Sequence, residues 1–83
     1  MGQLEDMSMF VRVVDAGGIS RAAEQLGLAK SAVSRRLADL ETRLGVKLLN
    51  RTTRKSSLTE AGQSYYERGI KIIDDVTELN TLT

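Results

Sequence analysis

The sequence predicts a small, mainly helical domain in which three helices are followed by a short β-hairpin and a long last helix. Apolar residues recur at helical spacing in four segments of the 83-residue chain, and a glycine follows each of the first three. Two short stretches between the third and fourth segments are typical of strands. The chain contains no cysteine, which excludes a disulfide framework and a cysteine-bound zinc cluster.

The first two helices are short and end at glycines. The apolar residues of the first helix are Leu4, Met7, Phe10, Val11 and Val14. Ala16-Gly17-Gly18 ends this run, because glycine readily adopts the left-handed conformation of a helix cap. The second helix is predicted over Arg21–Leu26, with Ser20 as its N-cap and Gly27 as its stop.

The third helix has the clearest period and forms a helix-turn-helix with the second. Its apolar stripe consists of Val33, Leu37, Leu40 and Leu44, and Gly45 closes it. Two helices that cross at a steep angle leave room only for a small side chain, which Ala23 supplies. Gly27 allows the positive φ of the turn, and Val33 points back into the shared core. An ordinary helical hairpin is the alternative interpretation.

A hairpin is predicted next, with strands at residues 47–50 and 55–58 and a turn at residues 51–54. The turn contains neither glycine nor asparagine, so this prediction depends on the neighbouring elements more than on turn chemistry. Its tip, Arg51-Thr52-Thr53-Arg54-Lys55, offers three cations and two hydroxyls, which suit phosphates or a minor groove. Such a hairpin is the wing of a winged helix-turn-helix, although a solvated charged loop is the alternative.

The last helix begins after Thr59, a suitable N-cap, and carries two apolar stripes. One stripe, which we predict to form a homodimer interface, consists of Tyr65, Ile72, Val76 and Leu79. The second consists of Tyr66, Ile70 and Ile73. One stripe can cover the domain itself and the other then needs a partner; a helix packed only on its own core is the alternative. Residues 1–58 are thus the winged helix-turn-helix domain and residues 59–83 the linker and dimerisation helix.

Charge is concentrated in the middle of the chain. The formal net charge of +1 divides into −2 for residues 1–25, +6 for residues 26–58 and −3 for residues 59–83. A basic segment of this kind is expected where a surface meets a polyanion. The chain contains no histidine and no cysteine, so most enzyme chemistries and metal sites are unlikely, and we predict neither catalytic residues nor a metal. No apolar run approaches a bilayer span, and we expect a soluble, cytoplasmic protein.

The outward face of the third helix has the composition of a DNA-reading surface. Arg35 is the best candidate for a bidentate contact to guanine, while an ion pair with Asp39 is its alternative role. Arg36 lies nearer the apolar stripe and is expected to contact a phosphate or another part of the chain. The complete set of candidate DNA-binding residues is Ser20, Arg21, Lys30, Ser31, Ser34, Arg35, Arg36, Thr42, Arg51, Thr52, Thr53, Arg54 and Lys55.

An ordered series of short motifs resembles the N-terminal winged helix-turn-helix domain of LysR-type transcriptional regulators. The series is Ser20-Arg21-Ala22-Ala23-Glu24-Gln25-Leu26, Ser31-Ala32-Val33-Ser34-Arg35, Leu40-Glu41, Leu44-Gly45, Leu48-Leu49-Asn50-Arg51 and Leu58-Thr59-Glu60-Ala61-Gly62. The resemblance implies a recognition helix over Val33–Leu44, a wing at Arg51–Lys55 and a dimerising linker helix after Thr59. Ala29 stands where many members have Ser or Thr as the helix cap, so Ser31 is the alternative cap.

The resemblance also implies a function. It is sequence-specific binding of double-stranded DNA by a homodimer, with each recognition helix in a major groove and each wing on the backbone or minor groove. We expect no cofactor in this chain; a small-molecule effector belongs to the C-terminal domain of full-length members, which is absent here. Higher oligomers and the transcription machinery are further partners implied by the family. The competing interpretation is a helical protein-interaction module, and an enzyme is a distant third.

Overall fold

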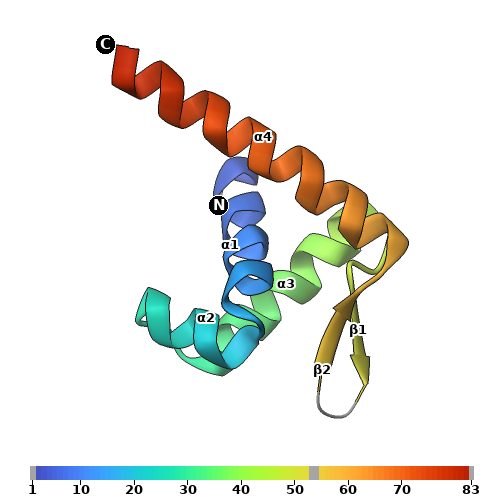
Figure 1. Cartoon of the computed structure of the whole chain (residues 1–83). Helices are drawn as coiled ribbons and strands as arrows, with labels where there is room; N and C mark the ends of the chain where they lie inside the picture. Colours follow the sequence, from blue (N-terminus) through green and yellow to red (C-terminus); the bar gives the residue numbers. More distant parts are fainter. Residues whose placement is uncertain (1, 53–54, 83) are drawn as a thin grey trace.

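The computed structural model describes residues 2–52 and 55–82 of the chain. A bundle of three helices carries a hairpin on one side, and the last helix crosses the first and extends past the bundle (Figure 1). This order of elements is the predicted one. Within the described residues the elements are α1 (Gln3–Ala16), α2 (Ile19–Leu26), α3 (Lys30–Leu44), β1 (Leu49–Thr52), β2 (Lys55–Leu58) and α4 (Glu60–Leu82).

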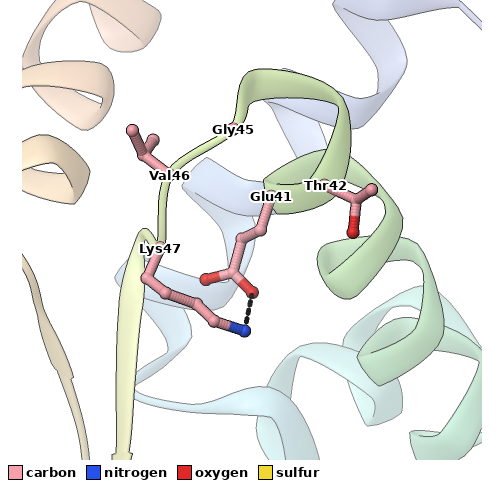
Figure 2. A pocket seen from close by; sticks show the side chains of 5 residues that line it. All are labelled: Glu41, Thr42, Gly45, Val46 and Lys47. Atoms are coloured by element: carbon pink, nitrogen blue, oxygen red, sulfur yellow. Dashed lines mark ion pairs between the residues drawn. The ribbon is translucent and has the colours of Figure 1, made fainter.

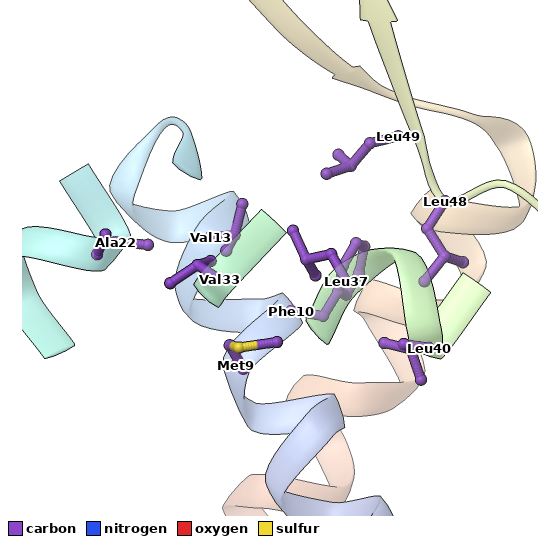
Figure 3. Packing of buried hydrophobic residues seen from close by; sticks show 10 residues of the cluster. Met9, Phe10, Val13, Ala22, Val33, Leu37, Leu40, Leu48 and Leu49 are labelled. Atoms are coloured by element: carbon purple, nitrogen blue, oxygen red, sulfur yellow. The ribbon is translucent and has the colours of Figure 1, made fainter. Parts of the chain in front are cut away.

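The core lies where α1, α2 and α3 meet, and the base of the hairpin closes it (Figure 3). Its largest fully buried side chains are Phe10, Val13, Val33, Leu37, Leu40 and Leu48. Ala23 and Val33, two of the residues predicted to pack the helix-turn-helix, are only 4% and 0% exposed. The stripe of α3 therefore faces inward, and the opposite side of the same helix is left for solvent or a ligand.

The turn between α2 and α3 has the predicted glycine geometry. Gly27 adopts the left-handed conformation, with φ 69°, and Leu28 donates its backbone N–H to the carbonyl of Ala23 at 2.9 Å. This bond closes the last turn of α2 with the same backbone that leads into α3. A residue with a side chain at Gly27 would be strained there, so the turn depends on glycine.

The predicted N-cap of α2 is wrong, whereas α3 begins directly after Ala29 as predicted and does not use the alternative cap Ser31. Helix α2 begins at Ile19 with Gly18 as its N-cap, so Ser20 lies inside the first turn. Helix α3 begins at Lys30 with Ala29 as its N-cap, and Ser31 likewise lies inside the helix. Neither cap uses a side-chain hydrogen bond. Packing of apolar residues sets both starts, because Ile19 contacts the core and Val33 is completely buried.

The second strand of the hairpin matches the prediction, whereas the first begins two residues later than predicted. The antiparallel register pairs Leu49 with Leu58 and Thr52 with Lys55. Lys47 and Leu48 are not in the strand because other groups bind their backbone. Thr59 donates its N–H to the carbonyl of Leu48 at 3.0 Å and its hydroxyl to the carbonyl of Lys47 at 2.6 Å.

The N-terminal part of helix α4 is capped by Thr59 and packs against the rest of the domain. The Oγ1 of Thr59 accepts the N–H of Gly62 at 2.9 Å, which confirms the predicted cap. Tyr65 packs edge to face on Phe10, with ring centroids 5.5 Å apart. One turn further on, Gly69 still packs against Met7 and Val11 of α1, whereas Ile72 and Leu79 beyond it are 46% and 61% exposed. The predicted stripe of α4 thus divides into one residue that packs on its own domain and others that face outward.

The two tyrosines of the chain make the stability of the fold depend on pH in the alkaline range. Burial raises the pKa of Tyr65, and the 2.6 Å hydrogen bond that Tyr66 donates to Asp15 raises the pKa of Tyr66. The folded state favours the neutral phenols. Their contribution to the stability of the fold is therefore fully present below the ordinary tyrosine pKa of about 10. It is lost as the pH rises through the folded-state values.

We expect Asp15→Ala to return the pKa of Tyr66 toward its ordinary value and to leave the pKa of Tyr65 raised. Tyrosinate absorbance during an alkaline titration measures both. Glu24→Gln, a change at an exposed acid of α2, is the control and leaves the curve unaltered. An identical curve for Asp15→Ala and the unmodified chain would contradict the role assigned to Asp15.

Candidate nucleic-acid interface

The face of α3 opposite the buried stripe is open. Lys30, Ser31, Arg35 and Thr42 are exposed, and Ser34 is partly buried. The alternative role of Arg35 receives no support, because within the described residues no ion pair joins it to Asp39. A shallow hollow of about 310 Å³ lies on this helix, lined by Ser31, Ala32, Arg35 and Arg36. Short side chains beside an exposed arginine leave room for the edge of a base.

Arg36 has the intramolecular contact, one of its two predicted roles. Its Nη2 lies 3.2 Å from Oδ1 of Asp6, and Nη1 of Arg43 lies 3.1 Å from Oδ2 of the same carboxylate. The Asp6 side chain is 11% exposed, whereas the side chains of Arg36 and Arg43 are 28% and 46% exposed, so only the carboxylate is largely shielded from solvent. The Nε of Arg36 is buried and has no hydrogen-bond partner among the described residues. Because Asp6 on α1 holds the Arg36 guanidinium in an ion pair, we leave Arg36 out of the proposed DNA interface.

A second buried carboxylate joins α3 to the hairpin. Glu41 is 5% exposed, and its Oε2 accepts the N–H groups of Leu48 and Leu49 at 2.7 and 3.1 Å. Its Oε1 lies 3.9 Å from the Nζ of Lys47, across a small pocket of about 220 Å³ (Figure 2). The wing is therefore attached to the recognition helix through the backbone at its base.

The hairpin projects from the bundle beyond α3 (Figure 1). Arg51 and Thr52 belong to β1 and Lys55 to β2, while Thr53 and Arg54 lie outside the described residues. At the other end of the helix-turn-helix, Ser20 and Arg21 are exposed in the first turn of α2. The structure thus places the wing strands and the reading face on elements joined by Glu41, with Ser20 and Arg21 on the neighbouring helix.

Sequence reasoning missed Asp6 and Glu41 as residues that organise this surface. A signal for Asp6 was present, because it precedes Phe10 by four residues and Val13 by seven and so shares their buried face. Glu41 follows Leu37 by four residues and likewise borders the apolar stripe. An acid at an inward-facing position indicates a buried ion pair or a hydrogen bond to backbone.

A model of bacterial regulatory helix-turn-helix proteins of the lysR family matches residues 4–63. The chain belongs to this LysR family. The transcriptional regulator CrgA of Neisseria meningitidis is 52% identical over 77 residues, which cover 93% of this chain and 26% of CrgA. The transcriptional activator AaeR of Escherichia coli K12 is 41% identical over 80 residues, which cover 96% of this chain and 26% of AaeR.

Solved LysR structures share the fold. The BenM DNA-binding domain, in its complex with catB site 1 DNA, has a TM-score of 0.92 at 31% identity and covers 98% of this chain and 90% of that one. The CbnR DNA-binding domain in its DNA complex has a TM-score of 0.87 at 29% identity and covers 96% of this chain and 92% of that one. The predicted mainly helical, winged helix-turn-helix fold of the LysR type is therefore confirmed.

The family assignment also indicates the class of protein to which the chain belongs. CrgA and AaeR are transcriptional regulators, so the LysR chain is a regulator domain and not an enzyme. It spans about a quarter of the length of these two relatives. No described helix is both long and apolar enough to cross a membrane.

Proposed function

We propose that this LysR domain binds specific double-stranded DNA sequences, with α3 in the major groove and the wing on the backbone or minor groove. The supporting observation is the open face of α3, where Arg35 lies among short polar side chains and opposite a stripe in which Val33, Leu37 and Leu40 are buried. The likeness to the BenM and CbnR domains, both solved with DNA, favours the same mode of binding. A gel shift with random duplex at low salt tests it, and an unshifted duplex would favour a protein-interaction module.

Arg35→Ala is expected to relax base preference while retaining most of the affinity for random duplex. A bidentate arginine contact discriminates between bases by roughly 1 to 3 kcal/mol, and a phosphate contact carries no such information. The measurement is competition between a site selected from a random duplex library and its shuffled version. Arg12→Ala, a change at an exposed arginine of α1, is the control and retains the preference. Equal loss on both duplexes for Arg35→Ala would assign the residue to the backbone.

We further propose that α4 dimerises the domain. The outward residues Ile72, Val76 and Leu79 supply apolar surface, whereas Tyr65 already packs on Phe10 and contributes at most its remaining surface. Charges favour an antiparallel pair of helices related by two-fold symmetry. Arg68 and Lys71 lie in the first half of α4, and Asp74, Asp75 and Glu78 lie further along. The first half also carries Glu60 and Glu67 and is neutral overall, but in an antiparallel pair Arg68 and Lys71 of one copy can meet the acidic half of the other.

Leu79→Ser is expected to weaken this dimer by roughly a hundredfold. Each copy loses about 1.5 kcal/mol of apolar burial, and the change occurs twice in a symmetric pair. Sedimentation equilibrium over a range of concentrations measures the dissociation constant. Leu4→Ser, at an exposed leucine of α1, is the matched control and leaves that constant unchanged. A similar loss in both variants would move the interface away from α4.

The remaining assignments concern the full-length protein. We propose residues 1–58 as the DNA-binding unit and residues 59–83 as the linker to a C-terminal domain that binds a small-molecule effector. Higher oligomers and contact with the transcription machinery belong to that longer protein, in the cytoplasm of a bacterium. The proposal is supported by CrgA and AaeR, each roughly four times the length of the matched segment.

A further inference from the structure

Glu41 occupies the junction between the reading helix and the wing. Its backbone carbonyl ends α3 by accepting the N–H groups of Gly45 at 2.8 Å and Val46 at 3.2 Å. Its side chain begins the wing by accepting the N–H groups of Leu48 and Leu49. One residue therefore holds both ends of the connection between α3 and β1.

The two amides at the base of the wing depend on this carboxylate. Leu48 and Leu49 are buried, and Leu48 lies before the first paired residue of β1. Without Glu41 their N–H groups would lose these acceptors in an apolar region, which is unfavourable. Charge strengthens the bonds, since a carboxylate binds amides more tightly than a neutral acceptor does.

The ion pair with Lys47 does not explain the burial of Glu41. The Lys47 side chain is 79% exposed, and its Nζ lies 3.9 Å from the carboxylate, so solvent screens this attraction. The shorter bonds go to the backbone of the wing. The geometry therefore indicates that Glu41 serves mainly as a hydrogen-bond acceptor for the amides at the base of the wing, and only secondarily as an ion-pair partner of Lys47.

We infer that Glu41 is a positioning residue for DNA binding, which fixes the wing relative to the reading face of α3. This inference rests on the proposed DNA-binding function. Glu41 follows Arg35 by six residues on one rigid helix, a rise of about 9 Å. The same helix carries Glu41 and Arg35. When Arg35 contacts a base, the Glu41 carboxylate therefore determines where the wing contacts the DNA backbone.

The test compares Glu41→Ala with Glu41→Gln at temperatures where both are folded by circular dichroism. Glu41→Ala is expected to weaken binding to a library-selected duplex about tenfold, and Glu41→Gln, whose amide oxygen still accepts, recovers most of that loss. To distinguish positioning of the wing from a merely structural role, Glu41→Ala is also made in a chain that carries Arg51→Ala and Lys55→Ala. If Glu41 acts through the wing, its effect on affinity decreases in that chain, where Arg54 is the remaining cation of the wing, while its effect on unfolding persists.

Two outcomes overturn the inference. They are an undiminished loss of affinity in the Arg51→Ala and Lys55→Ala chain, and full affinity for Glu41→Ala alone. Should Glu41→Ala fail to fold, Glu41→Asp keeps the charge, withdraws the acceptor by one methylene and enters the same comparison.

A failure of DNA binding itself is distinguishable. If the unmodified chain does not bind duplex, the proposed function fails, but residual dipolar couplings of the free chain still report the orientation of the wing relative to α3. Glu41→Ala or Glu41→Asp is expected to change that orientation and to speed hydrogen exchange of the Leu48 and Leu49 amides. An unchanged orientation in the free chain would contradict the positioning role independently of DNA.

Discussion

Gly62→Ala is expected to lower the free energy of unfolding by about 3 kcal/mol. Gly62 lies in the first turn of α4 and packs directly on the backbone of Leu48, and a Cβ built there collides with the Leu48 carbonyl oxygen. That carbonyl cannot move freely, because Thr59 binds it and Glu41 holds the N–H of the same residue. Relief of the collision requires α4 to separate from the base of the wing.

Gly69→Ala is the matched control for this prediction. A Cβ at Gly69 comes within 3.3 Å of Met7 Cγ and Val11 Cγ2, which are side-chain atoms that can shift. Alanine also favours a helix interior over glycine by up to about 1 kcal/mol, so the change is close to neutral. Urea unfolding followed by circular dichroism measures both variants. Equal stability of the two would show that α4 does not approach Leu48 this closely.

Local sequence signals predicted the helices well but missed the start of α2. Gly27 and Gly45 end helices where predicted, because the left-handed conformation is a local property of glycine. The start of α2 differs because a side-chain cap is optional, and packing of Ile19 against the core fixes the helical register instead. Thr59 is a cap in both prediction and structure, and there its hydroxyl also binds the carbonyl of Lys47.

Contacts between distant residues account for what the sequence did not predict. The first strand begins late because Glu41 and Thr59 bind the backbone at Leu48, and nothing within the segment 47–50 encodes this. Similarly, Asp6 meets Arg36 across thirty positions of the chain. The periodicity of a helix can place an acid on its inward face, but only the packed fold determines which groups that acid binds.

These contacts reduce the number of cations that are available to bind DNA. Asp6 places one negative charge between Arg36 and Arg43, and Glu41 lies beside Lys47. Of the eight cations in residues 26–58, these three lie in ion pairs, which leaves Lys30, Arg35, Arg51, Arg54 and Lys55 as the candidates for DNA contact. With Arg35 assigned to a base, about four cations per subunit are left for phosphates.

The affinity of the dimer for duplex is therefore expected to fall steeply with salt. About four phosphate contacts per subunit predict a slope near −7 for the logarithm of the binding constant against the logarithm of salt concentration. Between 50 and 200 mM salt this amounts to a loss of roughly 10⁴ in affinity. Fluorescence anisotropy with a labelled random duplex, titrated at several salt concentrations, measures the slope.

Two arginine variants locate the origin of that slope. Arg54→Ala is expected to reduce its magnitude by about 2 in the dimer and to weaken all sequences alike, since a phosphate contact is lost in each subunit. Arg43→Ala removes the same charge from a residue that pairs with Asp6 and lies outside the proposed DNA contacts, so the slope stays near that of the unmodified chain. Equal reductions in the two variants would mean that Asp6 releases Arg43 to the duplex. An affinity indifferent to salt would separate the basic segment from DNA binding altogether.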